Sequence, residues 1–197
     1  MTTPSTDPTP PADPAPAPVV LETERLLLRP PVAADIDAVF AACQDPDIQR
    51  WTVVPSPYTR ADAVFFVERL AVEGWREARN PVWCVVEKAT GTLVGTQGLS
   101  ARRPGSAEVG FWATAASRGR GYAVEALREV CRWALQEQGL RRLEWVAYVG
   151  NEPSLAVARK AGFTLEGTLR SFGERRGEFL DAWMGSLLAT DLEQQRD

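Results

Sequence analysis

The chain has 197 residues, enough for one domain whose core needs no disulfide or metal to be stable. The net charge is −4, so no basic excess points to nucleic acid or an anionic membrane as a partner. Histidine is absent, which excludes Ser-His-Asp and Cys-His hydrolases, histidine zinc sites and any histidine base. Cysteine occurs at three separated positions, which favours a reducing cytoplasm and neither a disulfide framework nor a metal site: Cys43, Cys84 and Cys131.

Residues 1–18 carry seven of the fifteen prolines and no Leu, Ile, Val, Phe or Trp. This composition predicts a disordered, solvated tail, or alternatively a proline-rich arm that binds a partner. The segment lacks the basic and apolar regions of a signal peptide, and no later apolar run approaches the ~20 residues that span a bilayer. We expect one domain over residues 19–193, followed by a short tail at 194–197.

From Val19 onward the pattern becomes regular. A strand of about eight residues begins near Leu21 and ends at Pro30-Pro31. Apolar residues at helical spacing follow Asp35, and Asp45-Pro46 closes that helix. A capping box at Thr59 opens a second helix that runs to about residue 78.

Strands and helices alternate in the rest of the chain. The predicted strands are 82–87, 93–99, 107–114, 142–149, 164–172 and 179–187. Helices are predicted from about Tyr122 to Gly139 and from the N-cap Asn151 to Gly162. The strand–helix–strand unit in the middle predicts one parallel pair, and the hairpins predict antiparallel pairs. The fold class is therefore α/β, a single mixed, mostly antiparallel sheet with helices on both faces.

Two glycines open the longest helix. The segment Arg118-Gly119-Arg120-Gly121-Tyr122-Ala123 follows a strand, and a helix N-terminus with glycines offers free N–H groups to an anion such as a pyrophosphate. The two arginine side chains would add charge-assisted hydrogen bonds. No Gly-Lys-Ser/Thr follows, and Val124 stands where a dinucleotide motif needs a third small residue. Alone, the pattern also fits a helix start with incidental glycines.

Two segments together resemble a known family. "RGRGYA" after the strand "AEVGFWAT" resembles motif A of the GNAT (GCN5-related N-acetyltransferase) superfamily, and "NEPSLAVARKAGF" resembles its second signature. The resemblance covers roughly residues 20–190. "ETERLLLRP" and "EVGFW" are typical of the RimJ/RimL-like ribosomal-protein N-acetyltransferases. The resemblance to this superfamily implies the acyl-CoA N-acyltransferase fold, in which the central parallel strands splay apart.

The same resemblance implies acetyl-CoA as cosubstrate and assigns the residues that bind it. The strand edge would bind the pantetheine arm through Val109, Phe111 and Trp112. The backbone of the glycine segment would hold the pyrophosphate: Arg118, Gly119, Arg120, Gly121, Tyr122 and Ala123. Asn151 would contact the pantetheine, and Ser154 would lie near the sulfur.

Amine acetylation needs a base, and the sequence without histidine leaves Glu108 as the candidate. Strand alternation places Glu108, Gly110 and Trp112 on one face and Val109 and Phe111 on the other, so Glu108 faces the substrate side or simply solvent. Ser154 is the candidate acid toward the leaving thiolate, with helix capping as the alternative role. Tyr122, Tyr148 and water are rival acids.

The resemblance favours a cytoplasmic N-acetyltransferase for a primary amine, most of all a protein N-terminal α-amine. The alternatives are an enzyme for a small amine (a polyamine, an amino acid or an aminoglycoside-type antibiotic) and a non-catalytic acyl-CoA-binding module. Trp51 and Tyr58, in an expected loop from Arg50 to Tyr58, would line the acceptor entrance, although exposed aromatic residues also serve dimer contacts. A homodimer is expected only by analogy with the family.

Overall fold

The structure, a computed structural model, describes residues 18–194, so the predicted tails lie outside it apart from Pro18 and Gln194. The strands are β1 (Leu21–Glu22), β2 (Leu26–Arg29), β3 (Val82–Glu87), β4 (Leu93–Ala101), β5 (Ser106–Ala113), β6 (Arg142–Tyr148), β7 (Thr164–Arg175) and β8 (Glu178–Leu188). The α-helices are α1 (Ile36–Ala42), α2 (Pro46–Trp51), α3 (Arg60–Phe65), α4 (Ala71–Arg76), α5 (Tyr122–Arg132), α6 (Glu152–Ala161) and α7 (Ala189–Gln194). No helix among these residues is long and apolar enough to cross a bilayer.

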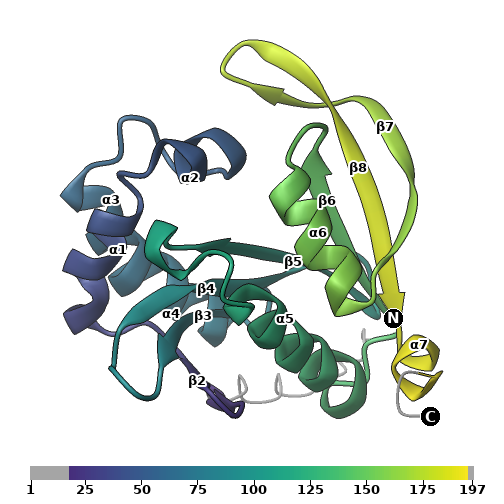
Figure 1. Cartoon of the computed structure of the whole chain (residues 1–197), viewed down its shortest axis with the longest axis horizontal. Coiled ribbons are helices and arrows are strands. Elements are labelled where there is room, and N and C mark those ends of the chain that lie inside the picture. Colours follow the sequence, from purple (N-terminus) through teal and green to yellow (C-terminus); the bar gives the residue numbers. More distant parts are fainter. Residues whose placement is uncertain (1–17, 195–197) are drawn as a thin grey trace, which may run out of the picture.

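The eight strands form one sheet in the order β1-β2-β3-β4-β5-β6-β8-β7 (Figure 1). Among the described strands, β5 and β6 are the parallel pair and all other neighbours are antiparallel. The predicted mixed, mostly antiparallel sheet is confirmed. Pairing between β5 and β6 ends at Val109 and Trp145, although the strands continue to Ala113 and Tyr148. The central strands therefore splay apart, as the resemblance implied.

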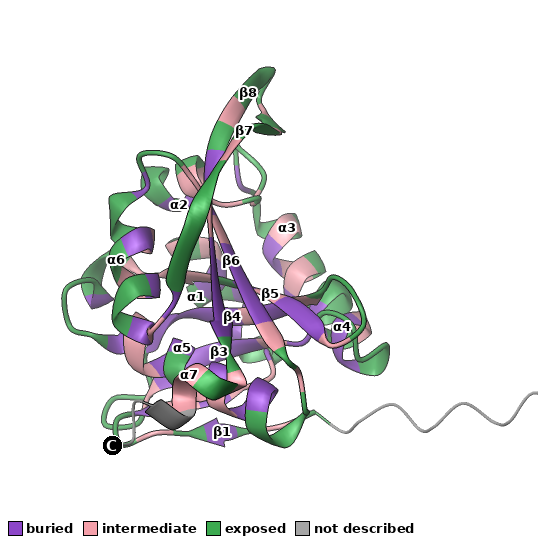
Figure 2. Cartoon of the chain, turned by 90° about the vertical axis from the view of Figure 1, so that its right-hand side faces the viewer, coloured by how far each residue is buried: buried purple, intermediate pink, exposed green. Residues whose placement is uncertain are grey.

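Helices cover both faces of the sheet. On one face, α5 and α6 pack on the strands through a core that includes Leu127, Val130 and Leu143, each fully buried. On the other, α1–α3 form a smaller core with Cys84 of β3. Neighbouring residues of β3 divide between the two cores because side chains alternate along a strand. Figure 2 shows buried residues along the central strands, whereas β7 and the tip of its hairpin are mostly exposed.

The N-terminal strand is shorter than predicted. The expected strand of eight residues is two strands joined by a turn, in which Thr23 N–H donates to the Leu26 carbonyl (3.0 Å) and Leu26 N–H donates to Thr23 Oγ1 (3.0 Å). A threonine side chain that bonds nearby backbone competes with the sheet ladder, which explains why the strand breaks here.

Two further boundaries differ from the prediction. Asp45-Pro46 ends α1 but also starts α2, because the Asp45 carboxylate accepts the Asp47 N–H (2.7 Å) as an N-cap and proline fits the first helical position. The final hairpin is longer than expected, with its turn at 176–177 instead of 173–177. The glycine at 173 lies inside β7, where the strand register shifts beside a bulge.

Candidate active site

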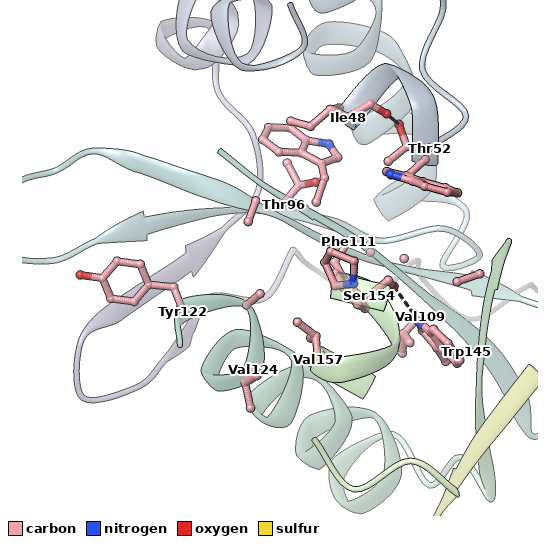
Figure 3. Close-up of a pocket in the computed structure, with 18 of the residues that line it drawn as sticks. Ile48, Thr52, Thr96, Val109, Phe111, Tyr122, Val124, Trp145, Ser154 and Val157 are labelled. Carbon is pink, nitrogen blue, oxygen red and sulfur yellow. Dashed lines mark hydrogen bonds between the residues drawn. The ribbon is translucent and has the colours of Figure 1, made fainter. Parts of the chain in front are cut away.

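A cavity of about 2260 Å³ runs between the helical layer α2–α3 and the splayed strands (Figure 3). Its walls come from α2, α3, β4, β5, β6, α5 and α6. Every predicted site residue except Arg120 lines it: Glu108, Val109, Phe111, Trp112, Arg118, Gly119, Gly121, Tyr122, Ala123, Asn151 and Ser154. The structure therefore gathers residues from two distant motifs around one space.

The splay leaves one edge of β5 open. Thr114 N–H donates to Val94 O of β4 (3.0 Å). Because alternate residues of a strand turn their N–H groups to the same side, Phe111 and Ala113 turn theirs toward β6, where β6 no longer pairs with them. Trp112 turns its N–H toward β4, so it reaches the cavity through its side chain. Backbone groups of Phe111 and Ala113 are thus free to bond an extended, amide-containing ligand; the sequence analysis did not name Ala113.

The N-terminus of α5 forms a cradle of backbone donors. Gly119 and Gly121 have φ values of +75° and +81°, a left-handed conformation that favours glycine. Gly121 is the N-cap and has no side chain to satisfy the first N–H groups; the first intrahelical bond is from Glu125 N–H to Gly121 O (3.1 Å). A Cβ atom on Gly119 would meet no atom within 4 Å. Open space above unsatisfied donors fits an anionic diphosphate.

The arginine side chains of the cradle are occupied elsewhere. Arg118 binds Asp45 (2.7 Å) and Asp47 (3.2 Å) at the start of α2. Arg120 binds Glu87 of β3 (3.0 Å). The expected reinforcement of the cradle by these two guanidinium groups is therefore not what the structure shows; they anchor it to the sheet and to α2, and the backbone supplies the donors.

Tyr122 is enclosed by the same network. Its ring lies between the guanidinium groups of Arg25 and Arg120, at 4.5 and 4.7 Å from the ring centroid. Its hydroxyl donates to Glu87, which raises the pKa of the tyrosine and lowers that of the carboxyl group. A phenol whose proton is bonded to a carboxylate is poorly placed to protonate a thiolate. Tyr122 therefore positions the cradle, as a buried side chain with 3% exposure.

Glu108 faces the cavity beside an open position. A Cβ atom on Gly110 would meet nothing within 4 Å, which leaves room for an acceptor. The Glu108 carboxylate accepts hydrogen bonds from Arg102 Nη2 (2.5 Å) and Nε (3.1 Å). Its neighbour across the parallel pair is Glu144, buried and bound by Arg103 Nη2 (2.5 Å). Arg102 and Arg103 of the β4–β5 turn thus hold two adjacent carboxylates.

Asn151 and Ser154 lie together at the start of α6, and Figure 3 shows Ser154 beside Trp145. The buried Asn151 side chain accepts the Ser154 N–H (3.2 Å), which confirms Asn151 as the N-cap. Ser154 Oγ accepts the indole N–H of Trp145 (3.0 Å). The serine therefore accepts one hydrogen bond and keeps its own proton free to donate. This bond could not be predicted from the sequence, because nothing local links a strand residue to a serine nine positions later.

The α2–α3 side of the cavity is lined mostly by apolar side chains. Trp51 lines it from the end of α2, with Val53 (99% exposed) and Phe65 (55% exposed) beside it. Trp51 thus lies where the sequence placed it, although in a helix instead of a loop. Tyr58 also lines the cavity but belongs to the core between the first helices, with 6% exposure, so it forms the floor instead of the entrance.

The open strand edge beside a helix N-terminal cradle is the arrangement that motif A implied. A family model described as an acetyltransferase (GNAT) domain matches residues 25–164. The chain belongs to this family. The uncharacterized N-acetyltransferase YoaA of Bacillus subtilis is 28% identical over 171 residues, which cover 86% of this chain and 96% of that protein.

Solved structures agree with this membership of the GNAT family. A GCN5-related N-acetyltransferase from Brucella melitensis superimposes with a TM-score of 0.77 at 26% identity and covers 91% of this chain and 83% of that one. The ribosomal L7/L12 α-N-protein acetyltransferase RimL, in complex with coenzyme A, has a TM-score of 0.78 at 19% identity, with 86% and 98% covered. This GNAT chain is an N-acetyltransferase that uses acetyl-CoA.

Proposed function

We propose that this GNAT enzyme acetylates the N-terminal α-amine of a protein. The observation that carries the proposal is the size of the cavity. Pockets for small ligands typically measure about 300–1,000 Å³, whereas this one measures about 2260 Å³ and continues to the exposed apolar residues of α3. That volume accommodates the cosubstrate together with the end of a peptide chain. The fold shared with RimL, an α-N-protein acetyltransferase, is in accord with this acceptor.

The proposed roles of the side chains follow from their positions. Bound acetyl-CoA supplies an activated acetyl group. Phe111 and Ala113 N–H groups bond its amide-containing arm, and the α5 cradle bonds its diphosphate. Glu108 accepts a proton from the acceptor ammonium, directly or through water, because a primary amine is mostly protonated at neutral pH. The acceptor nitrogen bonds the acetyl carbon as the carbon–sulfur bond breaks, and it loses its second proton to water. Ser154 donates its free proton to the departing sulfur and regains one from water, and the Trp145 N–H bond to its oxygen strengthens that donation.

A thiol-release assay tests the acceptor. Purified protein and acetyl-CoA are incubated with N-terminal peptides, polyamines, free amino acids and amino-sugar antibiotics, and free coenzyme A is measured. We expect release with peptides and little with the other classes. Release with small amines alone would contradict the proposal. Acetyl-CoA binding by calorimetry without release for any acceptor would favour the non-catalytic binding module instead.

A further inference from the structure

Two arginines at the tip of the β7–β8 hairpin reach across to α2. Arg175 and Arg176 both donate to the carbonyl oxygen of Gln49, the latter at 3.1 Å. In Figure 1 the tip bends over toward the end of α2. Arg50, the next residue of α2, adds a third positive charge. Two guanidinium groups that share one oxygen lie close together, and we call Arg50, Arg175 and Arg176 the arginine triad.

The triad has no carboxylate partner. Among residues 18–194, none of its members forms an ion pair. Glu178 lies opposite Arg175 in the hairpin, but these two side chains form no ion pair either. Of the arginines that line the cavity, Arg102 and Arg118 are paired with carboxylates, whereas Arg128 and Arg159 likewise form no ion pair among the described residues. Burial lowers the pKa of Arg175, and the neighbouring charges of Arg176 and Arg50 lower it further. Like charges held together without a counter-ion repel, so an anion placed among them is stabilised.

The backbone at the tip is unusual for an arginine. Arg176 has a φ of +51° and Gly177 a φ of +85°. Tight hairpin turns with positive φ at both central residues prefer Asn-Gly or Gly-Gly, and a long side chain there is strained. Closing the hairpin therefore does not explain the arginine. Strain of this kind clusters at functional sites, although Ala78 and Ser171 of this chain share it, so a function for Arg176 is inferred from the charges around it.

The triad lies beside the cavity wall at Trp51, although none of its three members lines the cavity itself. The Arg50 guanidinium is 4.7 Å from the ring centroid of Trp51, which lines the cavity. A Cβ atom on Gly150 would lie 3.6 Å from Trp51 Cη2, and Gly150 directly precedes the Asn151 N-cap. The Arg175 guanidinium lies over the ring of Tyr148 (5.8 Å), at the end of β6. The positive charge is therefore beside the turn that carries Ser154.

We infer that the arginine triad binds an anionic group, a carboxylate or a phosphate, that the acceptor carries near its amine. The inference deepens the proposed function, since it rests on the acceptor entering from this side. Guanidinium groups bind such anions through paired hydrogen bonds. The same charge repels polyamines and aminoglycosides. A free amino acid would supply its α-carboxylate, and a peptide would supply acidic side chains next to its first residue.

Paired acceptors distinguish these sources. The initial rates are compared for C-terminally amidated hexapeptides that differ only in Asp-Asp or Asn-Asn after the first residue, and for an amino acid against its amide. We expect KM to be at least tenfold lower for the anionic member of one pair. In the double variant Arg175→Gln/Arg176→Gly, this KM preference for the anionic acceptor should fall below threefold. Glycine at position 176 also relieves the strained turn. Arg170→Gln, an exposed arginine of β7 without an ion pair in the described residues, is the matched control and should keep it.

A binding measurement stands independently of turnover. N-acetylated product peptides cannot react, so their affinity for the protein with coenzyme A is measured by calorimetry. We expect the acidic product to bind at least tenfold more tightly than the neutral one, and the difference to vanish in the double variant. Equal affinity, or a preference that survives the substitutions, would overturn the inference. Tight binding of the acidic product without turnover of any acceptor would support the inference and contradict the proposed function.

Discussion

Replacing Glu108 by glutamine removes the proposed base but keeps the size of the side chain. A positioned general base contributes about 10²–10⁴ to the rate. The neighbouring carboxylate, Glu144, is buried and does not line the cavity, so it cannot take the place of Glu108. We therefore expect Glu108→Gln to lower kcat about 10³-fold, which corresponds to about 4 kcal/mol of barrier at ~1.36 kcal/mol for each factor of ten. Binding of acetyl-CoA should be unchanged, because it is proposed to depend on backbone N–H groups of β5 and α5, which the substitution leaves in place.

Unfolding of the Glu108→Gln variant would not explain a loss of kcat of about 10³-fold. The substitution weakens an ion pair with Arg102, whose side chain is 47% exposed, and such pairs contribute about 0.2–1 kcal/mol. Domains unfold with about 5–15 kcal/mol, so the variant stays folded. Steady-state kinetics with saturating acetyl-CoA at pH 7 measures the loss.

The pH dependence separates base catalysis from other causes. The deficit of Glu108→Gln should shrink above about pH 8, where more of an α-amine arrives unprotonated. Arg102→Gln, which leaves the carboxylate in place, is the control and should keep kcat within a few fold. A variant at position 108 that retains a fifth of the wild-type kcat at pH 7 would refute the role of the carboxylate as base.

Three further variants test other parts of the structure. Ser154→Ala should lower kcat by about 10–100-fold with little change in KM for acetyl-CoA. It should also cost about 1–3 kcal/mol of stability, because the Trp145 N–H loses its acceptor. An unchanged kcat would contradict the role of Ser154 as the acid. Ala78→Gly should add about 0.5–1 kcal/mol in urea denaturation, because this exposed alanine has a φ of +52° after α4; a loss of stability would contradict this. Hydrogen bonding to Arg142 lowers the pKa of Glu166 to about 2, so its stabilisation is present above pH 4.5 and is lost as pH falls toward 2. Glu166→Gln should flatten the fall in Tm between pH 5 and 2; an unchanged slope would contradict the assignment.

The features that the sequence predicted best depend on neighbouring residues. Thr59 forms its capping box with Asp62, Asn151 caps α6, and Gly162 ends that helix with a φ of +102°. The cradle at Gly119 and Gly121 belongs to the same class, since glycine conformation and a helix start are local properties. Two such local motifs at a family-typical separation were enough to predict the sheet and its splay.

The features that the sequence did not predict depend on partners far along the chain. Arg118 reaches Asp45, 73 residues earlier, and Arg25 reaches Glu125, 100 residues later. Long flexible side chains choose among many carboxylates, and only the packed fold brings one of them within reach. The same reason explains why the ion pair between Arg102 and Glu108 could not be predicted. The final hairpin was predicted, but with too long a turn, because the ladder resumes at Gly173 and Leu180 after a register shift.

The two halves of the cavity are built from different chemical groups. On the proposed cofactor side the groups are backbone N–H donors of β5 and α5, whose positions follow from a strand splay and two glycines. On the proposed acceptor side they are side chains, namely Glu108, Trp51 and the arginine triad. Substitutions there change the charge and shape that meet an acceptor without disturbing the sheet. Acetyl-CoA could therefore be predicted from two motifs, whereas the acceptor had to be inferred from where individual guanidinium and carboxylate groups lie.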